Sequence, residues 1–274
     1  MSGCRIPSDL CGLAELSDAY EVAAGDLLTL DLGAGWSRRW VAAWRSAGSQ
    51  VLCPVRDLST APLAGRQPWR RFTWQTRQRH RPGLQYLVST GRHHGFESLA
   101  EQRFLLAVDF VGGLLDVLAQ PFEIRFHTRG EMRRHIPDFL AVTESGCWLV
   151  DVRPGDRIGG DDRVAFAAAR ETALACGWRY LVVPGWRGAV VATLDALSAQ
   201  RRPLDDRLGV QRQVLDQVGS GPVAFGELVA ATSLPVVARA HVLHLLWHRR
   251  LRVDLALPLT DATLVWPAGT AAAR

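Results

Sequence analysis

The sequence predicts a mixed α/β fold that is followed by a smaller, mainly helical unit. Two observations support this prediction. Residues 96–184 show the order helix, three strands, helix, strand, and residues 205–274 show three helices followed by two strands. The first order, with its late crossover, is typical of a mixed sheet flanked by helices. Residues 1–95 contain a basic, Trp/Arg-rich segment, which we expect to be β-rich and to pack on the α/β core.

Composition restricts the class of protein. A chain of 274 residues with 48% apolar content is expected to form more than one domain, or one domain with an appendage, with real cores. It contains no run of 18 apolar residues, and its first residues lack a signal-peptide pattern, so we expect neither a membrane span nor secretion. The five cysteines are scattered and form no CxxC pair, which disfavours structural zinc and disulfides and favours the cytoplasm.

Charge is distributed unevenly along the chain. All 32 basic residues are arginine, and residues 36–94 hold eleven of them against a single acid, a net charge of +10. Five of the ten tryptophans lie in the same segment. Arginine interleaved with aromatic rings suits contacts to phosphates and stacking on bases, although these tryptophans could instead form the core of a small β-rich subdomain. The arginines expected to contact DNA are Arg70, Arg71, Arg77, Arg79, Arg81 and Arg92.

The elements before the predicted core are short. Residues 26–55 contain brief apolar runs typical of strands or short amphipathic pieces, residues 56–70 contain loop residues, and residues 70–89 alternate as a strand does. A helix is predicted from about Glu97 to Phe110, because apolar residues recur at helical spacing and Gly112-Gly113 follows.

Two acids mark the centre of the predicted core. After a strand-like stretch over residues 114–126, Asp138 stands near the start of an apolar strand and Asp151 near the end of the next. Thr143-Glu-Ser-Gly146 between them has turn chemistry, so the two strands are expected to pair as a hairpin. Two carboxylates placed together can hold a divalent metal ion for phosphodiester hydrolysis. The alternative is that these acids belong to an ordinary surface hairpin.

The C-terminal half contains the remaining elements. A helix over residues 162–176, ended by Gly177, precedes a strand over residues 178–183, and residues 185–204 are expected to form a linker with a short helix. From residue 205 onward, three helices and a strand pair give the winged-helix pattern. This unit carries seven arginines and six acids, a net charge of +1, which fits protein docking at least as well as DNA recognition.

The spacing of Pro137-Asp138 and Asp151-x-Arg153 is close to the PD-(D/E)xK nuclease signature. Such a site needs a third acid, and Glu97 and Glu101 lie on one face of the preceding helix. The carbonyl of Val152 is a candidate extra metal ligand. Arginine cannot act as a general base, but it keeps the positive charge of lysine and binds phosphate. Arg153 is therefore either a tolerated replacement in a chain without lysine or a mark of lost activity.

Several segments resemble, in order, the core of the TnsA-like endonuclease subunits of heteromeric transposases. The resemblance covers about residues 70–185 and is carried by Glu97-Ser-Leu-Ala-Glu101, Phe104–Phe110, Asp116–Phe122, Pro137-Asp-Phe-Leu140 and Val150-Asp-Val-Arg-Pro154. It implies a restriction-endonuclease-like core followed by a winged-helix domain. It also selects Glu101 over Glu97, and it assigns catalytic roles to Glu101, Asp138, Asp151 and Arg153.

The resemblance implies a metal-dependent DNA endonuclease. Mg²⁺ or Mn²⁺ would be bound by Glu101, Asp138, Asp151 and the Val152 carbonyl. The implied substrate is the double-stranded end of a mobile element, cut at its 5′ ends in a bacterial, nucleoid-associated complex. The implied partners are an integrase-type transposase subunit and an ATPase regulator subunit.

Two alternatives to this function stay open. The chain could be a DNA-binding or assembly subunit in which the acids no longer cut, or a stand-alone restriction or repair nuclease of the same fold. Cleavage that needs a metal ion and the partner subunits distinguishes the transposase nuclease from both. His127 and His135 flank the strands that carry the acids, and we expect them to pack in the core or at its rim.

Overall fold

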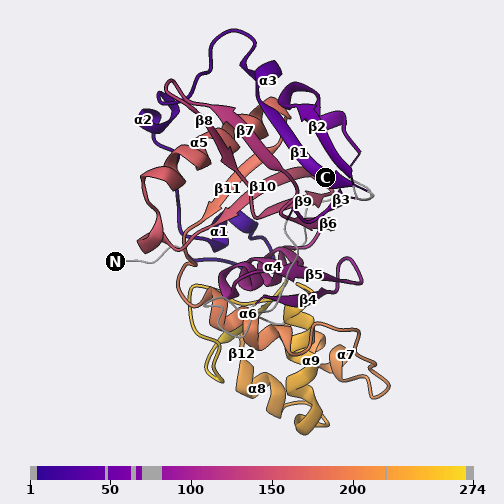
Figure 1. The fold of residues 1–274 in the computed structure, drawn as a ribbon. Coiled ribbons are helices and arrows are strands. Elements are labelled where there is room, and N and C mark those ends of the chain that lie inside the picture. The colour runs from indigo at the N-terminus through magenta and orange to yellow at the C-terminus, as the bar shows by residue number, and fades with distance from the viewer. Residues whose placement is uncertain (1–4, 47–48, 63–65, 70–81, 220, 270–274) are drawn as a thin grey trace. The chain divides into compact units, whose positions relative to one another are not determined.

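The computed structural model describes residues 5–46, 49–62, 66–69, 82–219 and 221–269 (Figure 1). The chain divides into two compact units. The central unit comprises residues 19–108 and 112–185, and the terminal unit comprises the residues up to Asp18, residues 109–111 and the chain from Trp186 onward. This division differs from the predicted one, because the beginning of the chain belongs with its end rather than with the α/β core.

The sheet that carries the two acids has four strands. Its order is β11 (Arg179–Val183), β10 (Gly146–Val152), β9 (Phe139–Thr143) and β6 (Leu114–Ala119). The predicted hairpin is confirmed, since β9 and β10 pair antiparallel across the turn. Strand β11 runs parallel to β10, as expected for a strand that returns after a crossover helix.

A second sheet contributes one residue to the candidate site. Its strands are ordered β2 (Ser49–Pro54), β1 (Val41–Ser46), β7 (Glu123–His127) and β8 (Met132–His135), and β3 (Arg66–Gln67) also pairs with β1. The predicted β character of the region around residues 41–54 is therefore confirmed. The region expected to be a loop instead contains a 3₁₀ helix, η1 (Val55–Thr60), with Val55 and Leu58 fully buried.

The stretch predicted as strand-like over residues 114–126 is divided between the two sheets. Strand β6 ends at Ala119 and β7 begins at Glu123. Between them Gln120 adopts a φ of +46°, a left-handed conformation that is uncommon for a residue other than glycine. Its peptide N–H donates to the carbonyl of Asp138 over 2.7 Å, so this break lies directly beside a predicted catalytic residue.

Two long helices belong to the α/β core. Helix α4 (Leu99–Val111) is capped at its start by Ser98, whose hydroxyl accepts from the Glu101 N–H over 3.2 Å, and Gly112 with φ +78° follows its last residue. Helix α5 (Gly160–Ala175) packs with a fully buried alanine face against the central core, which lets it approach the sheets closely. No helix in the described ranges is long and apolar enough to cross a membrane.

Shorter elements complete the central unit. They are helices α2 (Ala24–Leu27) and α3 (Trp36–Arg39), the 3₁₀ turn η2 (Gly155–Arg157), and the antiparallel pair β4 (Gly83–Leu87) and β5 (Arg92–Phe96). Phe126 of β7 and two buried aromatic residues next to strands of the second sheet, Trp40 and Phe122, share one core with Leu140 and Leu149 of the first sheet and with the alanine face of α5.

The terminal unit contains the three predicted C-terminal helices. These are α7 (Val210–Val218), α8 (Phe225–Ala230) and α9 (Pro235–Trp247), and α9 has Pro235 in its first turn as predicted. A small sheet of order β12 (Val223–Ala224), β14 (Leu264–Pro267), β13 (Leu251–Arg252) accompanies them.

Two segments that were assigned elsewhere pack in this terminal unit. Helix α6 (Val190–Ser198) contacts α9 and buries Leu194 and Leu197, so the segment expected to be a linker is part of a core. The N-terminal segment, which includes α1 (Leu13–Leu16), forms a β-bridge between Pro7 and Asp254. Ile6 also donates its N–H to the Asp254 carboxylate over 2.9 Å.

Candidate active site

The β9–β10 hairpin brings the two predicted strand acids together. Phe139 pairs with Val150, so Asp138 and Asp151 lie just beyond the last pair of the ladder. Oδ2 of Asp138 accepts a hydrogen bond from the Val152 N–H over 2.7 Å, which ties the side chain of one strand to the backbone of the other. Two short strands with a tight turn are thus sufficient to place both carboxylates at one end of the sheet.

Asp151 is buried and accepts a hydrogen bond at each carboxylate oxygen. Its side chain is only 3% exposed. The Tyr180 hydroxyl donates to Oδ2 over 2.7 Å, and Nε2 of His135 lies 2.8 Å from Oδ1. Tyr180 stands on the neighbouring strand β11, whereas His135 is the last residue of β8 in the other sheet. Burial, and then the charge of Asp151, raises the pKa of Tyr180 well above its ordinary value, which keeps the hydroxyl a donor.

Glu101 is turned toward the beginning of its own helix. Its Oε2 accepts from the Glu97 N–H over 2.8 Å, and its Oε1 accepts from the Ser98 hydroxyl over 2.9 Å. Because Ser98 also caps the Glu101 N–H, the two residues form a reciprocal capping arrangement. Burial raises the pKa of Glu101, and these two hydrogen bonds partly offset that effect.

The carboxylates influence one another electrostatically. The pKa of Asp138 is raised well above its ordinary value, first by burial and then by the negative charges of Asp151, Glu101 and Glu97, while the hydrogen bond from Val152 opposes the shift. The site therefore concentrates like charges in a poorly solvated place, and such sites are candidates for function.

The donor set fits a hard divalent cation in type but not in its present arrangement. Carboxylate and carbonyl oxygens are the ligands that Mg²⁺ and Mn²⁺ prefer. Within the described ranges, however, no three His, Cys, Asp or Glu side chains are grouped so that they could hold one metal ion. The predicted ligand that is turned away is Glu101, whose oxygens bind the start of helix α4.

Arg153 lies beside the site and pairs with an acid of helix α5. Its Nη2 is 3.4 Å from Oδ2 of Asp162, and its side chain is 46% exposed. Asp162 in turn accepts the Gly159 N–H over 2.9 Å at the start of the helix. The guanidinium thus has a partner that the sequence pattern did not predict.

The predicted DNA-contacting arginines lie only partly within the described residues. Arg70, Arg71, Arg77, Arg79 and Arg81 lie outside them. Arg92 is exposed and forms an ion pair of 2.6 Å with Asp116. Exposed pairs of this kind are weak, so Arg92 stays available to a phosphate.

The tryptophans of the basic segment divide between core and surface. Trp40 and Trp44 are buried, which confirms the alternative of a core role for these two residues, although the core is that of the whole central unit rather than of a small subdomain. Trp36 packs half-buried against Trp40, with ring centroids 4.7 Å apart. Arg45 lies over the ring of Trp69 at 5.9 Å, and Trp74 lies outside the described residues.

Sequence reasoning missed two residues of this site. Tyr180 was not considered, and His135 was expected only to pack in the core or at its rim. A polar ring in the otherwise apolar run Tyr180–Val183, on the strand predicted to return beside Asp151, was the available signal. Nothing in the sequence near His135 indicates that its strand approaches from a different sheet.

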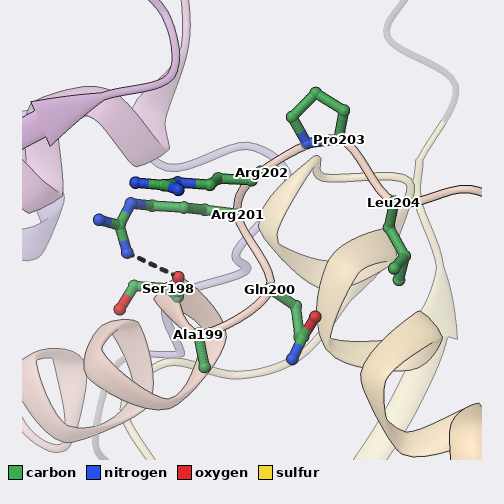
Figure 2. Close-up of a pocket in the computed structure, with 7 residues that line it drawn as sticks. All are labelled: Ser198, Ala199, Gln200, Arg201, Arg202, Pro203 and Leu204. Carbon is green, nitrogen blue, oxygen red and sulfur yellow. Dashed lines mark hydrogen bonds between the residues drawn. The ribbon is translucent and has the colours of Figure 1, made fainter. Parts of the chain in front are cut away.

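A pocket in the terminal unit is formed by residues that are distant in sequence from Asp138 and Asp151. It has a volume of about 330 Å³ and is lined by residues 198–204. In Figure 2 the side chains of Arg201 and Arg202 run side by side, and Nη1 of Arg201 donates to the Ser198 carbonyl over 2.8 Å. His244 and His248 donate to the carbonyls of the same turn. The Arg201 bond satisfies a carbonyl at the C-terminal end of α6, and the two histidine bonds hold the Gln200 and Arg201 carbonyls that follow the helix.

No protein-family model matches the chain, and no curated protein is significantly similar to it in sequence.

Proposed function

We propose that the chain is the metal-dependent DNA endonuclease subunit of a heteromeric transposase, which cuts the 5′ ends of a mobile element. The observation that carries the proposal is the placement of Asp138 and Asp151 at one end of the β9–β10 hairpin, where the charges of Asp151 and Glu101 both raise the pKa of Asp138. The ordered resemblance to TnsA-like subunits supports the same function. On this proposal the central unit is restriction-endonuclease-like and the C-terminal helices form a winged-helix domain.

Asp138, Asp151 and the Val152 carbonyl would hold Mg²⁺ or Mn²⁺, and Glu101 would join them after leaving its cap. A bound divalent metal would lower the pKa of a coordinated water and stabilise charge on the scissile phosphate. The chain's own task is then to hold the acids together and exclude competing contacts. The mutual repulsion of the carboxylates in the metal-free protein would be relieved by the cation.

In this proposal Arg153 binds the scissile phosphate rather than activating water. Its guanidinium is well shaped for bidentate contact with phosphate oxygens. The ion pair with Asp162 is half-exposed, and such pairs contribute only about 0.2–1 kcal/mol, so a DNA phosphate can displace it.

The terminal unit would contact the integrase-type transposase or the ATPase regulator, with DNA contact secondary. Its C-terminal part, residues 205–274, carries a net charge of only +1. A dedicated DNA reader usually has a marked basic face. The strongly basic segment over residues 36–94 is the better candidate for the main DNA surface. We place the complex in the bacterial cytoplasm, at the nucleoid.

A second function is favoured by a specific observation. Both oxygens of Asp151 and both of Glu101 already accept hydrogen bonds, and Arg153 is paired with Asp162. This arrangement suits a subunit that binds DNA and assembles the complex without cutting. A stand-alone nuclease of the same fold is the third possibility.

Nicking of element-end DNA by the reconstituted complex separates these functions. The proposed nuclease nicks only when both partners and Mg²⁺ are present, and Glu101→Gln abolishes nicking. Glu144→Gln, in the exposed turn at the opposite end of the same hairpin, is the matched control and should cut normally. Complex assembly without nicking would support the assembly subunit, and nicking without partners would support the stand-alone nuclease.

A further inference from the structure

The turn that follows helix α6 carries two neighbouring arginines beside a pocket. The pocket is lined by residues 198–204 and has a volume of about 330 Å³, within the range of about 300–1,000 Å³ that is usual for small-ligand sites. Apart from Arg201 and Arg202, the residues that line it are uncharged. The two arginine side chains run side by side (Figure 2). Two like charges therefore lie together with no acid in the lining of the pocket.

The fold uses only part of the Arg201 guanidinium. Nη1 donates to the Ser198 carbonyl over 2.8 Å. Nη2 makes no hydrogen bond to any described residue, and Nε is buried without a partner among them. Buried polar groups in proteins are normally hydrogen-bonded. Arg201 thus has donor capacity beyond what is needed to close the end of the helix.

Helix α9 holds the backbone of this turn in place. Nδ1 of His244 donates to the Gln200 carbonyl over 2.8 Å, and Nε2 of His248 donates to the Arg201 carbonyl over 3.1 Å. The Ser198 carbonyl is bonded as well. Carbonyl oxygens that would repel an anion are therefore occupied by donors, and the arginine side chains leave a backbone that is fixed before any ligand arrives.

The acids that follow the turn in sequence have other partners. Asp205 pairs with Arg207 over 3.3 Å, and both side chains are more than 80% exposed. Asp206 accepts hydrogen bonds from the first backbone N–H groups of α7. Neither acid lines the pocket, so neither neutralises its arginines there.

One further acid acts on the histidines that hold the turn. Burial, and then the charge of His244, lowers the pKa of His248, while Asp109 opposes this shift and Arg250 adds to it. The acid is thus accompanied by another arginine. The excess of positive charge that Arg201 and Arg202 bring to the turn is not cancelled by this pair.

We propose that the pocket at residues 198–204 binds a phosphate group, which Arg201 and Arg202 hold by charge-assisted hydrogen bonds. Guanidinium groups match the geometry of phosphate oxygens and always keep their charge. The lining offers no aromatic ring on which a base could stack, so the phosphate itself is the recognised group. It belongs either to the DNA backbone or to a free phosphate compound. The site would exist whether or not the candidate active site cuts DNA.

Nuclear magnetic resonance of the full-length protein, labelled at histidine, tests the site with inorganic phosphate as the probe. Chloride keeps the ionic strength constant, because the basic segment over residues 36–94 also attracts anions. The rings of His244 and His248 bond to the turn, so their signals should shift with phosphate and reach saturation. The signal of His127, on β7 of the central unit, is the internal reference and should stay unchanged.

Arg202→Gln removes one charge and leaves the bond from Arg201 to Ser198 in place. We expect phosphate affinity, read from the histidine shifts, to fall about 10-fold or more, the usual effect of losing a hydrogen bond to a charged group. Arg207→Gln is the matched control, since Arg207 is 87% exposed and lies outside the pocket. It should bind phosphate as the wild type does.

A second pair of variants changes the charge of the pocket without touching either arginine. Ala199 is exposed and lines the pocket. Ala199→Glu adds a carboxylate that pairs with the arginines and repels phosphate, so phosphate binding should be lost. Ala199→Gln adds a neutral side chain of nearly the same size and should retain binding. This pair decides the matter even where Arg202→Gln disturbs the turn.

A short DNA duplex identifies the source of the phosphate. If the DNA backbone supplies it, the duplex produces the same shifts of His244 and His248, and Arg202→Gln lowers DNA affinity while Arg207→Gln does not. If a free compound supplies it, inorganic phosphate produces these shifts and the duplex does not.

Two results would overturn the phosphate site. One is the absence of saturable shifts of His244 and His248 in the wild type with both probes. The other is equal phosphate affinity of Ala199→Glu and Ala199→Gln, together with unchanged affinity of a folded Arg202→Gln. The arginines would then serve only to close the end of α6.

Discussion

Arg153 and Asp162 form an ion pair at the edge of the candidate site, with Nη2 3.4 Å from Oδ2. The pair joins the residue that follows β10 to the first turn of α5. An arginine that must bind a DNA phosphate would first have to leave this partner. Breaking the ion pair with Asp162 therefore costs free energy when Arg153 binds a phosphate.

Asp162→Asn should increase DNA nicking by the complex, because it removes the charge that competes with phosphate for Arg153. The amide oxygen can still accept the Gly159 N–H, so the helix start should persist. A pair of this exposure is worth about 0.2–1 kcal/mol, which corresponds to an increase of up to about fivefold at limiting DNA. Unchanged nicking over a DNA titration would show that the pair does not compete with substrate.

Substitution of Arg153 itself tests its chemical role. Arg153→Lys should retain or increase nicking, since lysine keeps the charge, whereas Arg153→Ala should abolish it. Normal cutting by Arg153→Ala would make the residue structural.

The raised pKa of Asp138 predicts a pH dependence of stability. A carboxyl whose folded-state pKa lies above its unfolded value contributes stability at low pH and loses it as pH rises through the folded pKa. Asp138→Asn keeps an acceptor for Val152 and removes the charge. Its free energy of unfolding should therefore exceed that of the metal-free wild type at neutral pH.

Chemical denaturation between pH 4 and pH 8 measures this difference. The advantage of Asp138→Asn should grow with rising pH and should be about 0.5–2 kcal/mol, the common size of a stabilising substitution. A constant difference over the whole range would mean that Asp138 does not bear the repulsion described here.

The division of the chain predicts which truncation is tolerated. Removing residues 205–274 alone would expose Leu194 and Leu197 of α6 and leave Ile6 without its partner Asp254. A fragment of residues 19–185 should therefore be more soluble than one of residues 1–204, and it should lose binding to the partner subunits. Size-exclusion chromatography and thermal melting compare the two. Equal behaviour would contradict the assignment of α6 and the N-terminal segment to the terminal unit.

The basic segment should dominate DNA binding. Neutralising Arg70, Arg71, Arg77, Arg79 and Arg81 together should weaken binding to all sequences and reduce the slope of log K against log salt by roughly 0.9 for each phosphate that is no longer neutralised. The DNA affinity of this variant is compared with that of a double substitution in the terminal unit, Arg250→Ala and Arg252→Ala. Arg249 is unsuitable for it, because its guanidinium donates to the carbonyls of Val111 and Cys11. If the double substitution Arg250→Ala and Arg252→Ala weakens DNA binding more, the main DNA-binding surface lies in the terminal unit.

Local sequence signals predicted the elements but not their long-range contacts. Helix α4 and the β9–β10 hairpin follow from apolar spacing, from Gly112 and from turn residues, all of which act over a few positions. The Asp254 partner of Ile6 is 248 residues away, so no local pattern indicates it. The split at Gln120 depends on the pairing of β6 and β7 with different sheets.

In the candidate site, too, the long-range contacts could not be predicted from local sequence signals. The meeting of Asp138 and Asp151 could be predicted because one hairpin carries both acids. The contacts of Asp151 with His135 and Tyr180 span 16 and 29 positions and require the packing of two sheets. The orientation of Glu101 toward Ser98 was also missed, although Ser98 and Glu101 have the spacing of a capping box.

Strand-resolved cleavage of element-end DNA tests the central claim most directly. The complex reconstituted with the integrase-type transposase and the ATPase regulator is incubated with 5′- and 3′-labelled ends, with Mg²⁺ or with chelator. The proposed function predicts 5′-strand nicks that require Mg²⁺ and vanish in a complex containing Asp138→Ala, while assembly and 3′-end cutting persist. Nicking of the 5′ strand at the wild-type rate by Asp138→Ala would contradict the assignment of this site.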